Sequence, residues 1–359
     1  MSEVTVLGIF VADLSFSANK IPTTGETILG DKYNIGPGGK GCNQAIALAR
    51  LGCNVNFISK IGDDDHGKLA LNSLKSSRSN EDGFRKYLFG DKYNIGPGGK
   101  GCNQAIALAR LGCNVNFISK IGDDDYGKLA LNSLKQNKID TSNIIISKEH
   151  QTGVAGIHVD NNTGQNAITV IRGAPASFTK DDIDINIIKK SKIFLTQLEI
   201  PIEVTLHCLK VAKESGLINI LNPAPACKLD KKFFSLSDYF TPNEAEAEFY
   251  TGVKIKNESD AKESAKKLLA LGLKKVIITL GEKGLFYSDG KEEIYIKALP
   301  FKKVQDTTGA GDAFNGGLAY ALLRNKSIKE CLNIANQVAG LSTLKLGAGN
   351  SMPLLTDLK

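Results

Sequence analysis

Several residue types and patterns that would identify a protein class at once are missing from this sequence. It has no tryptophan, and its four histidines form no cluster. No apolar run approaches the roughly 20 residues of a membrane-spanning helix, and the first fifteen residues lack the basic segment of a secretory leader. We therefore expect no membrane partner, and we interpret Val4 to Phe10 as a buried strand.

Metal-type cysteine spacing is missing too. None of the seven cysteines belongs to a CxxC pair, and their number is odd. These features argue against a zinc site and against a disulfide framework. Reduced thiols are typical of cytoplasmic proteins, so we expect that location.

Charge is not concentrated in any segment. The formal net charge of +7 comes from 45 basic and 38 acidic residues spread along the chain. Nucleic-acid binding needs a clustered basic stripe, which this sequence lacks, so we expect no nucleic-acid partner. An anionic small-molecule substrate needs only a local field. With 42% apolar and 23% charged residues, disorder of the whole chain is excluded. The length of 359 residues suits a single large α/β core with an appendage.

A 46-residue segment occurs twice. Gly30–Lys75 and Gly90–Lys135 differ at one position, where His66 corresponds to Tyr126, and residues 76–89 join the copies. Such near-identity is typical of a recent tandem duplication or of an error in the gene sequence, not of a solenoid. Without one 60-residue unit the chain would have 299 residues (359 minus 60).

Either copy could belong to the folded core, and the sequence favours the first. In that case residues 76–135 are surplus and follow a helix end, where insertions cost little. If the second copy is used, the surplus splits a strand that GETILGDKYNIG would otherwise form. The second copy does run smoothly into the following segment. Exchange between the two copies, or swapping between two chains, stays open.

Elsewhere, short apolar runs alternate with amphipathic segments. Expected strands include 153–160, 167–171, 193–195, 218–221 and 275–280, with a hairpin from 284–288 and 294–296; expected helices include 183–190, 259–271, 312–323 and 327–344. The alternation predicts an α/β fold with a mostly parallel central sheet and helices on both faces. Ligands of such folds bind at the carboxyl ends of the strands.

The strongest local motif is DTTGAGD, from Asp306 to Asp312, which opens a helix. Its small residues Gly309, Ala310 and Gly311 let backbone N–H groups converge at a positively polarised helix end. This pattern predicts an anion hole for a phosphate in transfer. Asp312 is placed to take a hydroxyl proton beside that hole as a general base. The alternative is that an acid in a first helical turn is only a cap.

A glycine-rich loop, GPGGKGCN from Gly36 to Asn43, also leads into a helix. It is not a Walker A loop, because Gly41 rather than Ser or Thr follows Lys40. We expect close backbone approach to a polar ligand, with Asn43 or Gln44 bonding hydroxyl groups. A plain strand-to-helix turn is the alternative.

Other polar residues are ambiguous when taken alone. Asp13 and Glu199 each follow an expected strand, where a solvated loop acid is equally compatible. Asn243 and Glu246 lie three apart at a helix start and could share a hydrated Mg²⁺, although acids there also complement the helix dipole. The segment 278–284 could flank a nucleotide.

Together these motifs resemble the ribokinase family of the PfkB carbohydrate kinase superfamily. The segments that carry the resemblance are, in order, GGKGCNQA, LTQLE, LNPAPA, TPNEAEAE, ITLGEKG and DTTGAGDAFNGG. The resemblance covers almost the whole chain apart from the surplus repeat. It implies ATP-dependent phosphorylation of the 5-hydroxyl of D-ribose, with Asp312 as the base and the backbone of Gly309 to Gly311 holding the developing charge.

The resemblance also implies three sets of site residues. Sugar contacts would come from Val11, Asp13, Gly39, Lys40, Gly41, Asn43 and Glu199, with Gly99, Lys100, Gly101 and Asn103 as the second-copy alternatives. ATP would be bound by Asn243, Thr279, Leu280, Gly281, Gly284, Gly311 and Asn336, with Asn243 and Glu246 holding Mg²⁺ through water. A K⁺ activator would be held by Asp306, Thr308, Ser342, Lys345, Gly347 and Ser351.

The implied domain is a single one, 1–359, with a small β-sheet lid from about 21–37 and 153–160. Lids of this family are often used for dimerisation, so a homodimer is implied. Val11 departs from the pattern, because an Asn commonly stands there. Two alternatives stay open: another sugar or nucleoside kinase of the superfamily, and a nucleotide-binding homologue impaired by the duplication.

Overall fold

The computed structural model describes residues 4–7, 11–23, 25–38, 40–50, 55–58, 95–159, 166–301 and 304–358. The chain divides into two compact units. The first comprises residues 1–19 and 30–93, and the second comprises residues 20–29 and 94–359. The first copy of the repeat therefore belongs to the first unit, and the second copy belongs to the second unit from residue 94 onward.

The described part of the first unit contains two strand pairs and a helix. Strand β1 (Val4–Leu7) pairs in parallel with β5 (Val55–Ile58), and β2 (Val11–Ser17) pairs antiparallel with β4 (Lys32–Gly38). Helix α1 (Lys40–Arg50) follows β4 and buries an apolar stripe that includes Ala45 and Ile46. Residues 67–75 of the first copy, whose sequence also predicts a helix, lie outside the described residues.

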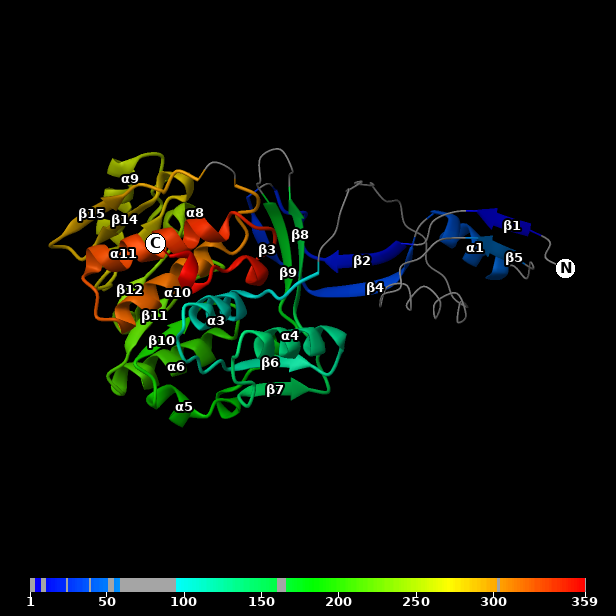
Figure 1. The fold of residues 1–359 in the computed structure, drawn as a ribbon, viewed down its shortest axis with the longest axis horizontal. Helices are drawn as coiled ribbons and strands as arrows, with labels where there is room; N and C mark the ends of the chain where they lie inside the picture. The colour runs from blue at the N-terminus through cyan, green and yellow to red at the C-terminus, as the bar shows by residue number, and fades with distance from the viewer. Residues whose placement is uncertain are drawn as a thin grey trace. The chain divides into compact units, whose positions relative to one another are not determined.

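A six-stranded sheet forms the centre of the second unit (Figure 1). Its strands, in spatial order, are β10 (Ile193–Thr196), β11 (Ile218–Leu221), β12 (Tyr239–Phe240), β13 (Val276–Thr279), β14 (Leu285–Ser288) and β15 (Glu293–Ile296). The first four run parallel, and β13, β14 and β15 run antiparallel to one another in turn. The expected α/β class is confirmed, as is the expected hairpin, which is β14–β15.

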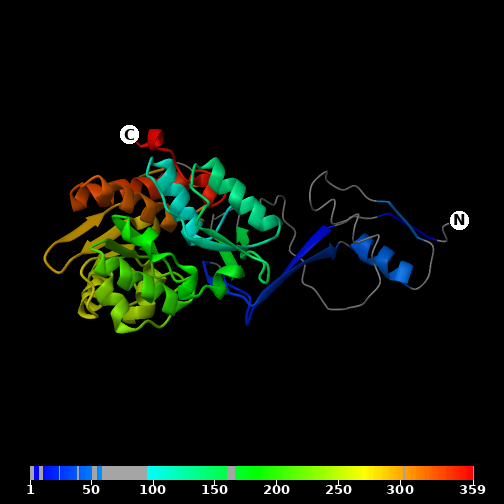
Figure 2. The same cartoon turned by 90° about the horizontal axis from the view of Figure 1, so that it is seen from below.

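Helices cover both faces of this sheet, and Figure 2 shows the layers. One face carries α6 (Ile202–Glu214), α7 (Lys231–Leu236), α8 (Glu244–Thr251) and α9 (Glu258–Ala270), and the other carries α10 (Ala310–Leu323) and α11 (Ile328–Ser342). Side chains alternate along a strand. Consequently Leu221 packs with the first set of helices, whereas its neighbour Ile220 packs with α10 and α11.

The second copy of the repeat is built into this unit. Its helix α3 (Lys100–Arg110) packs on α10, so closely that a Cβ added at Gly316 would stand 2.6 Å from the Ala107 Cβ. The chain continues through β6 (Ser119–Gly122), α4 (Asp125–Gln136) and β7 (Ile144–Ser147), and β6 and β7 pair in parallel. The assignment of 76–135 as surplus must therefore be corrected for residues 95–135. A sequence pattern cannot distinguish two nearly identical copies.

A three-stranded sheet occupies part of the predicted lid. It consists of β3 (Thr27–Leu29), β9 (Asn166–Ile171) and β8 (Val154–Val159), in the order β3–β9–β8. The predicted segment 21–37 does not stay together, because β3 pairs with β9 whereas β4 pairs with β2 in the first unit. The other predicted segment, 153–160, corresponds to β8, and residue 160 lies outside the described residues.

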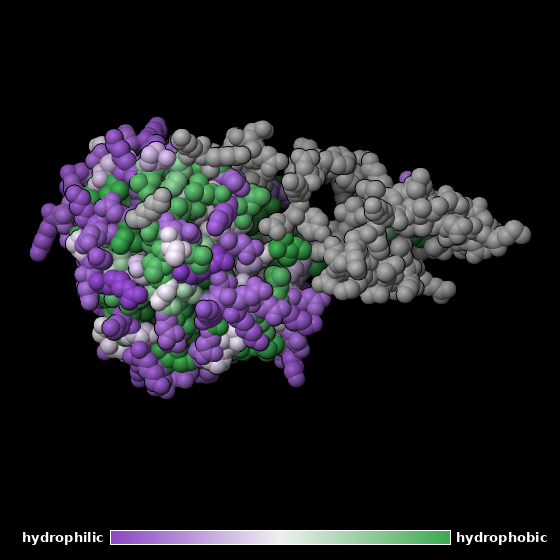
Figure 3. Space-filling model, in the orientation of Figure 1, coloured by the Kyte–Doolittle hydropathy of each residue, from purple (hydrophilic) through white to green (hydrophobic). Residues whose placement is uncertain are grey.

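The surface of the second unit is mixed in character. Hydrophilic and hydrophobic residues are interspersed over the face in Figure 3.

Helix α5 (Ile185–Lys189) packs beside α6. None of the helices in the described part of the chain is both long and apolar enough to cross a bilayer.

Candidate active site

Polar residues gather at the carboxyl ends of the parallel strands. Gln197 and Glu199 follow β10, Asn222 follows β11, and Thr241 follows β12. The N-terminal turns of α3 and α10 contact these residues through hydrogen bonds. The site therefore lies at the edge of the sheet where the topology predicts ligand binding.

Asp312 is the most enclosed acid of this group. It lies in the first turn of α10 with 6% of its surface exposed. Its Oδ2 accepts a hydrogen bond from Asn103 Nδ2 at 2.8 Å, and its Oδ1 accepts one from Gln104 Nε2 at 3.0 Å. Burial raises the pKa of Asp312 above its usual value, against the lowering by the Lys100 charge and by these two amide donors.

The start of α10 presents backbone N–H groups beside this carboxylate. Gly309 caps the helix with φ of 81°, a left-handed conformation that favours glycine. The N–H of Ala310 donates to the Thr307 carbonyl at 3.2 Å. Those of Gly311 and Asp312 have no acceptor within the described part of the chain. A Cβ added at Gly311 would meet nothing within 4 Å, so an anion could approach this turn closely.

The N-terminus of α3 supplies a second cluster of polar groups. Gly99 precedes the helix with φ of 85°, and the backbone N–H of Lys100 donates to Glu199 Oε2 at 2.8 Å. Burial alone would lower the pKa of Lys100, but the carboxylates of Asp312, Glu199 and Glu246 raise it above the usual value. The lysine is thus a protonated cation among three acids.

One buried oxygen at the site has no partner. Asn103 is 4% exposed, its Nδ2 is bonded to Asp312, and its Oδ1 accepts no hydrogen bond from the described residues. An unsatisfied buried acceptor costs free energy. A ligand hydroxyl that donates to this atom would remove the cost.

The sequence favoured the first copy at this position, and the structure places the second copy there. Lys100 and Asn103 contact Glu199 and Asp312, whereas Lys40, Gly41 and Asn43 lie on α1 in the first unit. Gly39 lies outside the described residues. Val11 and Asp13 are on β2, which also belongs to the first unit.

Comparison with known proteins matches the chain to the pfkB family of carbohydrate kinases over residues 1–85 and 89–355. The chain belongs to this family. It is similar to a ribokinase of Haemophilus influenzae, with 40% identity over 268 residues, 74% of this chain and 87% of that protein. It is also similar to a deoxyribokinase of Salmonella typhi, with 34% identity over 264 residues, 73% and 86% of the two chains.

A solved structure supports the same assignment. The ribokinase of Arabidopsis thaliana complexed with ribose and ATP aligns with a TM-score of 0.62 and 25% identity, over 99% of this chain and 97% of that one. The ribokinase-like fold is thereby confirmed. This protein is a carbohydrate kinase of the pfkB family.

The residues expected to hold Mg²⁺ also cap a helix. Asn243 and Glu246 form a reciprocal cap of α8: Glu246 N donates to Asn243 Oδ1 at 2.8 Å, and Asn243 N donates to Glu246 Oε2 at 2.9 Å. One carboxylate oxygen of Glu246 is left for a hydrated cation. Burial raises the pKa of Glu246 to about 7, against lowering by Lys100. A nearby cation would favour the ionised form, so the residues fit such a group.

The expected nucleotide residues lie beside β13. Thr279 ends this strand, and its N–H donates to the Pro242 carbonyl at 2.9 Å. Gly281 adopts φ of 54°, and a Cβ there would meet nothing within 4 Å. Leu280 bonds to Gly284 through its N–H, and Asn336 Nδ2 donates to the Lys297 carbonyl at 2.9 Å.

The expected K⁺ residues are mostly buried around Asp306. Its Oδ1 accepts from Thr308 N and its Oδ2 from Gly347 N, each at 2.9 Å, which joins two loops. Asp306, Thr308, Ser342 and Ser351 are all less than 10% exposed, whereas Lys345 is exposed. This oxygen-rich set suits a hard monovalent cation. Among the described residues, no cluster of three His, Cys, Asp or Glu side chains could hold a metal by itself.

The sequence motifs did not predict several residues of the site. Gln197, Asn222, Thr241 and Asn315 form a buried or partly buried hydrogen-bond network around Gln104. The available signal was their position: each of the first three directly follows a strand, and Asn315 lies three residues after Asp312. Polar residues at those positions meet at one sheet edge.

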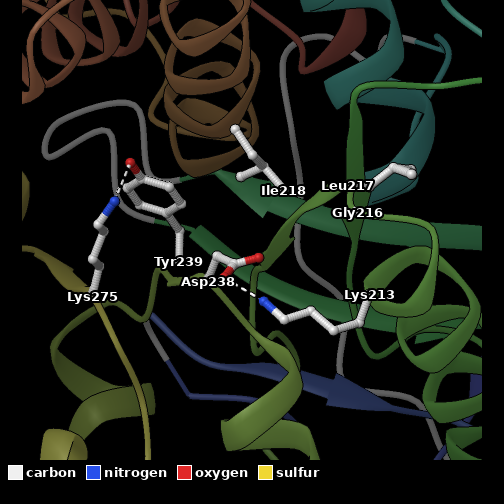
Figure 4. A pocket seen from close by; sticks show the side chains of 7 residues that line it. All are labelled: Lys213, Gly216, Leu217, Ile218, Asp238, Tyr239 and Lys275. Atoms are coloured by element: carbon white, nitrogen blue, oxygen red, sulfur yellow. Dashed lines mark hydrogen bonds and ion pairs between the residues drawn. The ribbon is translucent and has the colours of Figure 1, made fainter.

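A separate cavity of about 300 Å³ lies at the other edge of the sheet (Figure 4). Gly216, Leu217 and Ile218 precede or begin β11, and Lys275 precedes β13. Asp238, just before β12, forms an ion pair with Lys213 across the cavity. These amino ends of the strands are remote from the polar cluster at the carboxyl ends.

Proposed function

We propose that this protein transfers the γ-phosphoryl group of ATP to the 5-hydroxyl of D-ribose. The observation that carries the proposal is Asp312, a buried carboxylate next to two N–H groups without acceptors at the start of α10. Phosphoryl transfer needs exactly such positioning of a base and of donors for the developing charge. The similarity to curated ribokinases supports ribose as the sugar.

Asp312 takes the proton in the proposed reaction. The oxygen of the sugar hydroxyl attacks the γ-phosphorus, its proton passes to the Asp312 carboxylate, and the bond from phosphorus to the β–γ bridging oxygen breaks to release ADP. The N–H groups of Gly311 and Asp312 at the start of α10, which have no acceptor among the described residues, donate to the phosphoryl oxygens. Bound Mg²⁺ would neutralise part of the phosphate charge, and Asn243 and Glu246 would hold its water shell.

The sugar would be bound at the start of α3. Lys100 offers a cation, and Asn103 offers an acceptor oxygen that has no partner among the described residues. The Glu199 carboxylate can accept hydrogen bonds from sugar hydroxyl groups. A Cβ added at Gly99 would meet nothing within 4 Å, so a ligand could approach the backbone closely there. In the family pattern Thr279 to Gly284 with Asn336 flank the nucleotide.

A deoxyribose kinase is the second candidate, because a deoxyribokinase is among the similar proteins. Turnover of ATP with ribose, 2-deoxyribose, fructose and adenosine would separate these substrates. We also infer that the protein is cytoplasmic. We infer in addition that it forms a homodimer through the β3–β9–β8 sheet, and light scattering on the purified protein would test whether it is a dimer.

We further propose that K⁺ activates the enzyme at the Asp306 site. A cation bound there would order the loop that leads to Gly309 and its N–H groups, because Asp306 already joins the loops of Thr308 and Gly347. We expect activity to fall when K⁺ is replaced by tetramethylammonium at matched ionic strength. Equal activity in both salts would refute this part.

The test of the main proposal is Asp312→Asn. The variant keeps the size of the side chain and should still bind nucleotide, but it cannot accept the proton. We expect kcat with ribose to fall on the order of 10²–10⁴-fold. Near-normal turnover would contradict the role of Asp312, and wild-type protein that binds ATP without phosphorylating any of the four sugars or nucleosides would indicate an impaired homologue.

A further inference from the structure

Gln104 is a buried amide whose hydrogen-bonding groups are all used. It is 1% exposed, and its Nε2 donates to Asp312 Oδ1 at 3.0 Å and to Asn222 Oδ1 at 3.3 Å. Its Oε1 accepts a hydrogen bond from Gln197 Nε2. The side chain thus lies between the carboxylate and two residues that follow the strands β10 and β11.

The direction of these bonds is determined by a backbone group. The carbonyl of Thr241 can only accept, so Asn222 must turn its Nδ2 toward it, at 3.2 Å. The Oδ1 of Asn222 then faces Gln104, and Gln104 must present its NH₂ group there. The same NH₂ group reaches Asp312. A chain of three amide or carbonyl groups therefore specifies a donor, and not an acceptor, next to the carboxylate.

We propose that Gln104 is a positioning residue for Asp312. Gln104 holds one carboxylate oxygen of Asp312, so that the remaining lone pairs of the carboxylate face the substrate. The inference rests on the proposed role of Asp312 as general base. Asn103 holds the second oxygen in the same way. Each carboxylate oxygen has two acceptor positions, so both amides leave room for a sugar hydroxyl.

Gln104 also acts on the charge of Asp312. The charged groups that face this site are Lys100 on α3, Glu199 after β10 and Glu246 on α8, with Arg172 acting on Glu199. Burial raises the pKa of Asp312, and the Gln104 donor lowers it. Removal of the donor should therefore raise the pKa of Asp312 and protonate the base at higher pH.

The experiment is a pH profile of kcat/KM for Gln104→Met, an apolar change of similar size. We expect kcat to fall on the order of tenfold, with the KM for ATP unchanged and the acidic limb moved to higher pH. The control is Gln44→Met in the first copy. Gln44 has the same sequence neighbours but is exposed on α1, so its kinetics should match the wild type.

A second variant covers the case in which Gln104→Met does not fold. Gln197→Met removes the bond to Gln104 Oε1 without touching Asp312, and should move the acidic limb in the same direction by a smaller amount. An unshifted acidic limb in every folded variant of this pair would overturn the role of Gln104. That result combined with an inactive Asp312→Asn would leave the general base intact, whereas an active Asp312→Asn would remove the proposed function itself.

Discussion

Residues 55–58 and 115–118 have the same sequence, Val-Asn-Phe-Ile, and different secondary structures. The first segment is β5, which pairs in parallel with β1. The second forms no strand, and it has one isolated bridge, between Asn116 and Asp140. Since β1 occurs once in the chain, only one of the two segments can pair with it at a time. Strand formation depends on a partner, and identical residues cannot supply one.

The helices that precede these segments, in contrast, have the same secondary structure in both copies. α1 and α3 begin and end at equivalent residues, because helical hydrogen bonds are local. Their burial differs, however. Ala45 and Ile46 are buried like Ala105 and Ile106, but Gln44 and Ala47 are exposed, whereas Gln104 and Ala107 are buried. The second face of α3 is covered by α10.

A pair of alanine-to-leucine substitutions, one on α3 and one on α1, tests this difference in burial with the largest expected effect on stability. Ala107 is fully buried against Gly316, so Ala107→Leu should overpack the α3–α10 contact and lower the free energy of unfolding by about 1–3 kcal/mol. Ala47 is exposed, so Ala47→Leu should change it by no more than about 0.5 kcal/mol. Urea unfolding of both variants measures the difference. Equal losses would contradict the different packing of the two copies.

Much of the second unit could be predicted from local patterns. Strand β11 matches the expected 218–221, and α9, α10 and α11 lie within two residues of most expected ends. Apolar runs and helical periodicity indicate the type of secondary structure, and they do so without reference to the partner that covers it. The Asp312 motif was recognisable for the same reason, because the proposed anion hole consists of consecutive residues.

The rest of the site depended on contacts between distant segments. Asn103 and Asp312 are separated by 209 positions, and nothing in the sequence distinguishes Asn103 from Asn43. The tolerance of surface loops to insertions favoured the first copy. The packing of α3 on α10 and the network of Gln197 and Asn222 at the strand ends join segments that are far apart in the sequence, so local patterns do not reveal them.

The central claim is that the second copy of the repeat forms the sugar site. Its most direct test is the KM for ribose of two single variants, Asn103→Ala and Asn43→Ala. Asn103 has a buried Oδ1 without a partner next to Asp312, and we expect its loss to raise the KM on the order of tenfold or more. Asn43→Ala should stay within about twofold of the wild type. A raised KM in Asn43→Ala together with an unchanged one in Asn103→Ala would contradict the account.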